Sequence, residues 1–161
     1  FHLARHAAEG SDSSLSGVEL MWLIYSSTTI LMNITVTLAR AASNTHMMML
    51  GGLMQPYRWT IDGKTWGDHV PVTATSGERV EIMFHNMSMM AHPMHLHGHM
   101  FQVVALNGKR FAGAMRDTVQ VPPMAMVTVA VDAGEAARWM LHCHHMPHLS
   151  TGMMTEFAVS A

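Results

Sequence analysis

Short runs of alternating apolar and polar residues, separated by turn signals, fill the chain from residue 57 almost to its end. In the clearest run, 79–84 (RVEIMF), every second side chain is apolar, which is typical of a strand with one buried face. Asp62-Gly63, Ser76-Gly77 and Asn107-Gly108 supply the turns. With this spacing and almost no helical periodicity, we expect an all-β sandwich or barrel. The other strand-like runs are 57–61, 70–75, 95–106, 124–131, 138–145 and 153–159.

Residues 1–45 lack this punctuation, so we leave 1–45 as an unassigned N-terminal segment and expect the domain to occupy 46–161. The most apolar stretch, 18–39, is long enough to span a bilayer and contains one charge, Glu19. Seven Ser, Thr and Asn residues dilute it, and residues 33–38 alternate like a strand. A membrane span is therefore the less favoured expectation. Because the chain starts at Phe1, we expect a processed product or a fragment.

The composition is unusual in its 13 His, 19 Met and single Cys among 161 residues. A net charge of −2 without a basic run argues against nucleic acid as a partner. The lone Cys can form no internal disulfide and is inert, reactive or a metal ligand. Methionine commonly fills cores, but thioethers also select Cu(I), and the clusters at 46–49 (HMMM) and 87–90 (MSMM) are more typical of a copper-binding surface. Four aromatic residues are expected in the core: Tyr57, Trp59, Trp66 and Trp139.

A histidine motif with the sequence HCHHMPH predicts one strand that serves two metal sites. Because side chains alternate along a strand, Cys143 faces one side while His142 and His144 face the other. The proline turn that follows can return His148 to the side of Cys143, and Met153 can follow it. Two His, one Cys and a weak axial Met form the ligand set of a blue copper site.

The other motif, HPMHLHGH at 92–99, supplies the remaining nitrogen donors. His95 and His97 share a face, whereas His92 is out of step with them and can face the sulfur. Met154 remains an alternative axial ligand, and His99 and His145 match no ligand position, so a supporting role is expected for both. The motifs thus sort into His92, Cys143, His148 and Met153 for one copper, and His95, His97, His142 and His144 for another cluster.

Together with RDTV at 116–119 and VPP at 121–123, these motifs resemble the C-terminal copper motifs of multicopper oxidases, including laccase-like and copper-resistance members. The resemblance covers residues 57–159 and implies a cupredoxin fold, a Greek-key β-barrel. It implies His92, Cys143 and His148 as equatorial and Met153 as axial ligands of a type 1 copper, His95 as a type 2 ligand, and His97, His142 and His144 as type 3 ligands.

The resemblance also implies a copper-dependent oxidoreductase. The type 1 copper would take electrons from a reducing substrate, phenol-type or Cu(I), and pass them through catalytic His142, Cys143 and His144 to a trinuclear cluster that reduces O2 to water. In the family, half of the cluster histidines come from elsewhere, so we expect another cupredoxin domain or a homo-oligomer such as a trimer. We expect a periplasmic or secreted location. The alternatives are a stand-alone electron-transfer blue copper protein and a copper-binding or tolerance protein.

Overall fold

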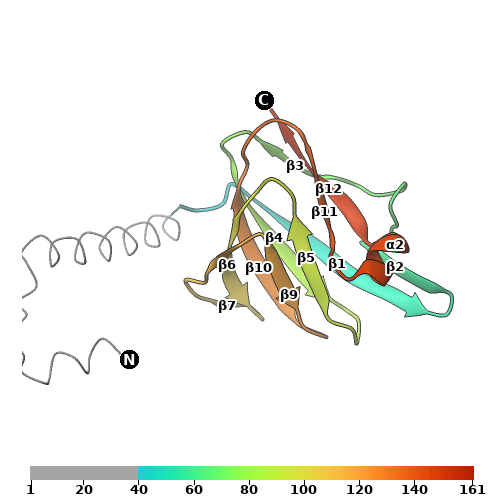
Figure 1. Cartoon of the computed structure of the whole chain (residues 1–161). Coiled ribbons are helices and arrows are strands. Elements are labelled where there is room, and N and C mark those ends of the chain that lie inside the picture. Colours follow the sequence, from blue (N-terminus) through green and yellow to red (C-terminus); the bar gives the residue numbers. More distant parts are fainter. Residues whose placement is uncertain (1–39) are drawn as a thin grey trace, which may run out of the picture. The chain divides into compact units, whose positions relative to one another are not determined.

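The computed structural model describes residues 40–161, which form two β-sheets around one hydrophobic core (Figure 1). The apolar segment 18–39 and the strand expected at 33–38 lie outside these residues. The first sheet contains β1 (Asn44–Met54), β2 (Tyr57–Ile61), β4 (Arg79–Asn86), β6 (Phe101–Leu106), β7 (Lys109–Arg110), β8 (Met115–Arg116) and β10 (Met126–Asp132). The second contains β3 (Val72–Thr75), β5 (His92–Leu96), β9 (Thr118–Val121), β11 (Arg138–Cys143) and β12 (Met154–Ser160), and a short helix, α2 (Met146–Ser150), follows β11.

The order of strands is β2-β1-β4-β10-β6-β7 in the first sheet, with β8 on β6, and β3-β12-β11-β5-β9 in the second. Most neighbours are antiparallel, but β1 pairs with β4 and β12 with β3 in parallel. Strands that are neighbours in the sheets are often distant in sequence, as in Greek-key architectures. The expected all-β class is confirmed. Within residues 40–161, no helix is long and apolar enough to cross a membrane.

The apolar faces anticipated from alternation point into the core. In β10, Val127, Val129 and Val131 are at most 3% exposed, and Phe84 of β4 and Phe157 of β12 are fully buried. Burying each such side chain stabilises the fold by roughly 2 kcal/mol through the hydrophobic effect. The hairpin turn at Asn107-Gly108 is also present, with positive φ at both residues, and joins β6 to β7.

The expectation of one strand over 95–106 is wrong, because the chain changes sheets within this run. β5 ends at Leu96 in the second sheet, and β6 begins at Phe101 in the first. Gly98 lies between them with φ +67°, a conformation that is costly for residues with a side chain. A Cβ at this position would also lie 2.3 Å from the ring of Trp139. The glycine therefore makes the crossing possible, and a period-two pattern cannot reveal it.

β1 was not anticipated as a strand, and it begins two residues before the expected domain boundary. Its alternation divides the methionine run: Met48 is buried in the core, whereas Met47 and Met49 are exposed. The run is thus a strand with one apolar face, and only its outer face adds to a methionine surface. The methionines of the second cluster, Met87, Met89 and Met90, are all exposed.

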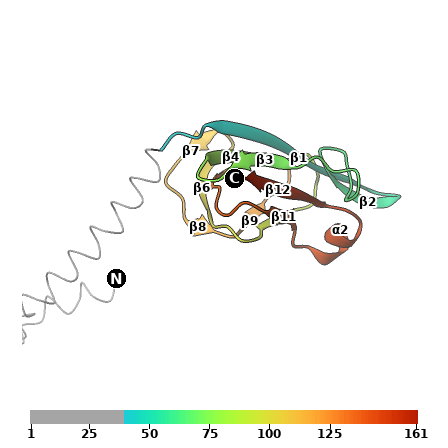
Figure 2. The ribbon, with the colours of Figure 1, turned by 90° about the horizontal axis from the view of Figure 1, so that it is seen from above.

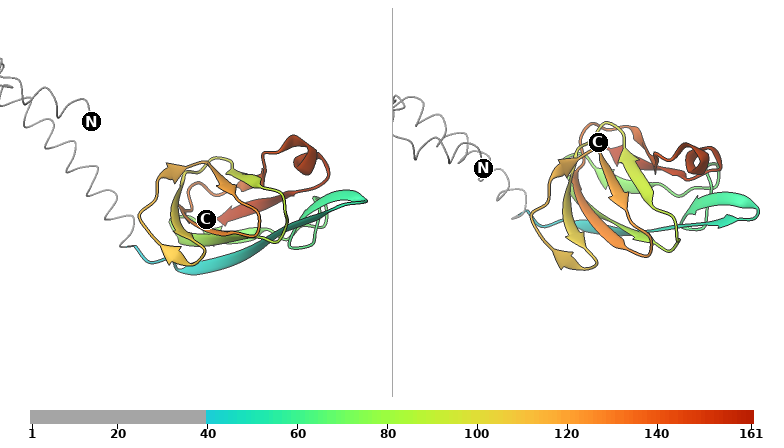
Figure 3. Two further views of the ribbon diagram at one scale, coloured as in Figure 1. Left: turned by 90° about the horizontal axis from the view of Figure 1, so that it is seen from below. Right: turned by 60° about the horizontal axis from the view of Figure 1, so that its bottom comes forward.

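The hairpin of β1 and β2 lies at the same end of the domain as α2 in every view (Figures 2 and 3). It brings Trp59, which is buried as expected, to that end of the core. Trp139 packs partly buried against the core, also as expected. The same expectation is wrong for Tyr57 and Trp66, which are 40% and 43% exposed. The hairpin thus places a buried aromatic residue, Trp59, and an exposed one, Tyr57, near His148 of α2.

Candidate metal centres

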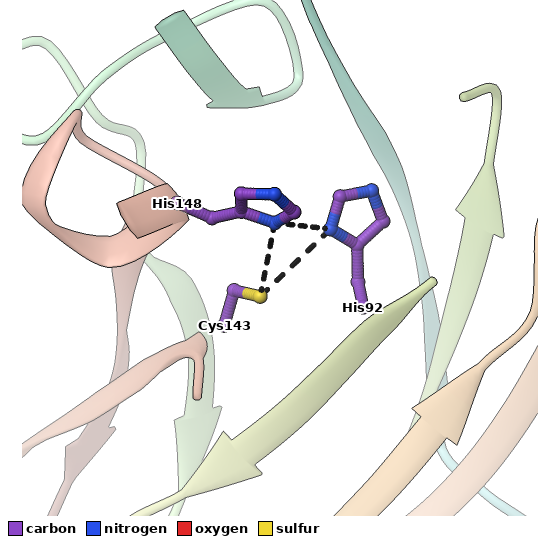
Figure 4. A group of neighbouring side chains, drawn as sticks. All are labelled: His92, Cys143 and His148. Carbon is purple, nitrogen blue, oxygen red and sulfur yellow. Dashed lines mark hydrogen bonds between the residues drawn. The ribbon is translucent and has the colours of Figure 1, made fainter. Parts of the chain in front are cut away.

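Three side chains meet at the end of the domain near α2, with their donor atoms turned toward one point (Figure 4). His92 Nδ1 lies 3.1 Å from His148 Nδ1, and Cys143 Sγ lies 3.8 Å and 3.7 Å from these two atoms. All three residues are fully buried. The structure therefore brings together His92, Cys143 and His148 as the sequence grouped them.

The donor set fits a metal ion. First-row metals bind imidazole nitrogen at about 2.0 Å and thiolate sulfur at about 2.3 Å, which sets bound donors roughly 3.3–3.8 Å apart. The two distances to sulfur, 3.8 Å and 3.7 Å, lie in this range, and the distance of 3.1 Å between the two nitrogens is slightly shorter. Two neutral imidazole nitrogens facing each other and a sulfur need a cation or a proton between them. His2Cys with an axial Met is the set that favours copper.

Backbone hydrogen bonds hold the segment that returns to the sulfur. The N–H of Cys143 donates to the carbonyl of Met153 over 3.1 Å, and the N–H of Met153 donates to the carbonyl of His148 over 3.1 Å. Gly152, with φ +113°, makes the turn before Met153. Met153 is fully buried on the core side, while Met154 begins β12 and is only partly buried. This difference in burial favours Met153 over Met154 as the axial ligand.

Burial sets the charge of these groups when no metal is bound. Desolvation lowers the pKa of His92 to about 4, with a contribution from neighbouring His148, and lowers that of His148 to about 4. The same effect raises the pKa of the Cys143 thiol to about 11. The metal-free group is thus neutral at pH 7, and a bound cation would displace the thiol proton.

The metal-free chain should lose stability as the pH falls from about 6.5 toward 4. The folded pKa values of His92 and His148 lie below the ordinary value of 6.5, so the unfolded chain binds protons first. Above pH 6.5 both imidazoles are neutral in the folded and in the unfolded chain, so no stability is lost there through their protonation. We expect the free energy of unfolding to drop by about 2–4 kcal/mol between pH 7 and pH 5. Urea unfolding at the two pH values measures it.

The matched control replaces both imidazoles, as His92→Gln with His148→Gln, and should flatten this part of the profile. An equally steep loss in the double variant would show that other groups cause it.

A second group of imidazoles lies beside the first. His97 Nε2 is 3.0 Å from His142 Nε2, and the donor atoms of His95, His97 and His142 all lie within 4.8 Å of one another. The ring of His144 lies 5.6 Å from that of His95 and 5.8 Å from that of His142. His142 is buried, His95 is half-buried, and His97 and His144 are exposed. All four predicted cluster residues are therefore neighbours on one partly open face.

The register of β5 and β11 explains how the two groups separate. His95 is directly opposite His142, and Met94 is opposite Cys143. Met94 and Cys143 are fully buried in the core, whereas His95 and His142 lie on the other face. Consecutive residues of one strand, His142 and Cys143, thus contribute to different groups. Only a short covalent path separates the two candidate metal centres.

Polar neighbours orient several of these rings. Nδ1 of His95 lies 2.9 Å from both the carbonyl oxygen of Asp117 and Oγ1 of Thr118, and Nδ1 of His142 lies 3.0 Å from the carbonyl of Cys143. These contacts leave Nε2 of His95 and Nε2 of His142 free to bind a metal ion between the rings of the second group. Such partners fix the tautomer of a ligating histidine.

Ser88 orients His92 in the first group. Its Oγ lies 2.8 Å from Nε2 of His92 and 2.9 Å from Oδ1 of buried Asn86, whose amide donates to three backbone carbonyls. The sequence analysis missed Ser88 and Thr118 because their spacing carries no ligand signal. His99 has the expected supporting role: its two ring nitrogens contact the carbonyl of His97 and the N–H of Gly134. His145 is exposed at the start of α2, its ring 4.2 Å from that of His148.

Comparisons with known proteins point to one family. Residues 39–161 match a family model described as multicopper oxidase. The chain is 40% identical over 107 residues to multicopper oxidase MmcO of Mycobacterium tuberculosis, covering 66% of this chain and 21% of that protein. It is 34% identical over 120 residues to copper resistance protein A of Escherichia coli, covering 74% and 20%.

Among solved structures, the McoA multicopper oxidase of Aquifex aeolicus superimposes with a TM-score of 0.65 at 32% identity, covering 73% of this chain and 29% of that one. The chain thus spans about a fifth of the length of these curated relatives. Its sandwich is the cupredoxin fold expected from the resemblance, and copper is the metal of the family. The chain belongs to the multicopper oxidase family.

Proposed function

We propose that the chain is the electron-accepting domain of a copper-dependent oxidase. In this proposal His92, Cys143 and His148 hold a type 1 copper with Met153 as its axial ligand, His95 is a type 2 ligand, and His97, His142 and His144 are type 3 ligands. The observation that carries the proposal is that two adjacent residues of β11, Cys143 and His142, belong to different groups of metal-binding side chains.

The coppers would supply one-electron redox chemistry at the first centre and the four-electron reduction of O2 to two waters at the second. The residues supply the rest. Burial keeps His92 and His148 neutral and ready to bind, and Cys143 links the first centre to its neighbour His142 through the backbone. Leu149 follows His148 and no carboxylate occurs before Glu156, so protons for O2 reduction would come from another part of the protein.

The cluster would be completed by histidines from another cupredoxin domain or from other copies, as in a trimer. Exposed His97 and His144 support this proposal, because they leave one side of the second group open to a partner. The short span of the chain relative to its curated relatives supports another domain in particular.

We propose O2 and a reducing substrate, phenol-type or Cu(I), as the reactants, and a periplasmic or secreted location. The relatives include laccase-21 of Oryza sativa and copper resistance protein A, which fit the two classes of donor. A role in copper binding or tolerance is the second candidate. It is favoured by the exposed methionines of the two clusters, Met47, Met49, Met87, Met89 and Met90.

Copper counting with oxygen uptake tests the proposal. The chain loaded with Cu(II) should show an intense blue band that a phenol or Cu(I) bleaches. An assembly that completes the cluster, by a second domain or by oligomerisation, should hold about four coppers and consume O2. A completed assembly that bleaches without consuming O2 would make the chain an electron carrier instead. A copper-loaded chain without any blue band would contradict the type 1 assignment.

A further inference from the structure

The imidazole of His148 is covered by an indole ring. Trp59 stacks on it with ring centroids 4.0 Å apart and an angle of 25° between planes, and its edge contacts His92 at 5.1 Å. His148 is fully buried and Trp59 is 2% exposed. An electron donor in solution therefore cannot touch the His148 ring.

The two imidazoles of the first centre differ in their outer nitrogen. Nε2 of His92 is bonded to Ser88, whereas Nε2 of His148 is buried and has no hydrogen-bond partner among the described residues. A buried polar atom without a hydrogen-bond partner lowers the stability of the fold by about 1–3 kcal/mol, so such an atom is unusual in a folded protein. When Nδ1 binds a metal ion, this Nε2 carries the ring proton and is a donor without an acceptor among the described residues.

The β1–β2 hairpin is built to hold the indole in this place. Gly52 of β1 is paired with Trp59 of β2, and a Cβ at Gly52 would lie 2.4 Å from Cε3 of the indole. Only a glycine clears this space. Tyr57 lies further out on the same strand, its ring 6.1 Å from that of Trp59 and 6.4 Å from that of His148, and it is 40% exposed. Two exposed rings thus lie near the covered centre: Tyr57, beyond the indole, and His145, whose ring is 4.2 Å from that of His148.

We propose that Trp59 determines which electron donors the type 1 centre accepts, by keeping organic donors off His148 so that electrons cross the indole from the side of Tyr57. The proposal rests on the proposed function. Each donor molecule loses one electron, which reduces Cu(II) to Cu(I), and a phenol donor also releases its hydroxyl proton to water. In the native chain the donor stays at least one ring spacing from His148, which disfavours small phenols that react best in direct contact.

Opening the cover tests this. The full chain and its Trp59→Leu variant are loaded with Cu(II), and bleaching of the blue band is followed anaerobically by stopped flow. The electron donors are hydroquinone and hexacyanoferrate(II). Hydroquinone is small and can form a hydrogen bond, whereas hexacyanoferrate(II) is too bulky to enter the space that the Trp59 indole would leave over His148. We expect the variant to react about tenfold faster with hydroquinone, because the free Nε2–H of His148 gains an acceptor at contact distance. The rate with hexacyanoferrate(II) should stay the same within about twofold.

Two further variants separate gating from packing. Trp66→Leu removes an indole that stacks on His69, and both rates should stay at the native values. Trp59→Phe retains an aromatic cover, so an intermediate gain with hydroquinone is expected even if Trp59→Leu fails to fold. An unchanged ratio of the two rates in the blue Trp59 variants would overturn the inference and leave the proposed function intact. Absence of the blue band in the native chain would defeat both.

Discussion

Cys143→Ser is expected to abolish the blue band of the copper-loaded chain completely. The band requires a thiolate bound to copper, and Cys143 is the only cysteine in the sequence. Serine keeps the size of the side chain but replaces a soft ligand with a hard one, so His92 and His148 would at most hold a colourless or weakly coloured ion. Visible absorption and electron paramagnetic resonance of the native and variant chains, each titrated with Cu(II), measure the effect.

The matched control is His144→Gln, one residue along the chain. His144 is exposed on the other face of the segment and belongs to the second group, so the band should keep its position and intensity. A blue band in Cys143→Ser, or its loss in His144→Gln, would contradict the separation of the two centres.

Gly98→Ala should destabilise the domain by roughly 2–5 kcal/mol. Its positive φ costs an alanine about 1–2 kcal/mol. The new methyl group would overlap the ring of Trp139, and such overpacking costs a further 1–3 kcal/mol or so. The strain falls beside His97, so copper binding by the second group should weaken as well. Urea unfolding of the metal-free chains gives the change in the free energy of unfolding.

Gly108→Ala separates the two causes of this loss. Gly108 also has a positive φ, +78°, but a Cβ there meets no atom within 4 Å. Only the conformational cost of about 1–2 kcal/mol should remain. Equal losses in the two variants would show that the contact with Trp139 is unimportant.

The sequence was sufficient for the parts of this domain that depend on local pattern. Alternation predicted the buried valines of β10, and the Asn107-Gly108 pair predicted the hairpin turn between β6 and β7. Parity along the strand also predicted that Cys143 and His142 would face opposite ways, which the register of β5 and β11 bears out. These features require only side-chain period and turn chemistry, both of which are written in consecutive residues.

What the sequence did not reveal depends on contacts between distant segments. Trp59 and His148 are 89 positions apart, and nothing in either neighbourhood indicates that they stack. The same holds for the crossing at Gly98, where the reason for a glycine is the ring of Trp139. In β1 the methionine run hid the alternation, because methionine is equally at home on a buried and on an exposed face.

The division of β11 between two centres restricts how the length of this segment can change. Adding or removing one residue between Leu141 and His145 would exchange inner and outer side chains and disrupt both centres at once. A change of two residues would restore the faces but displace the donors by roughly 6.6 Å along the strand. Point substitutions at exposed positions can be accommodated, whereas insertions and deletions cannot. Loop-length variation should therefore be confined to segments such as the turn at 107–108, away from this strand.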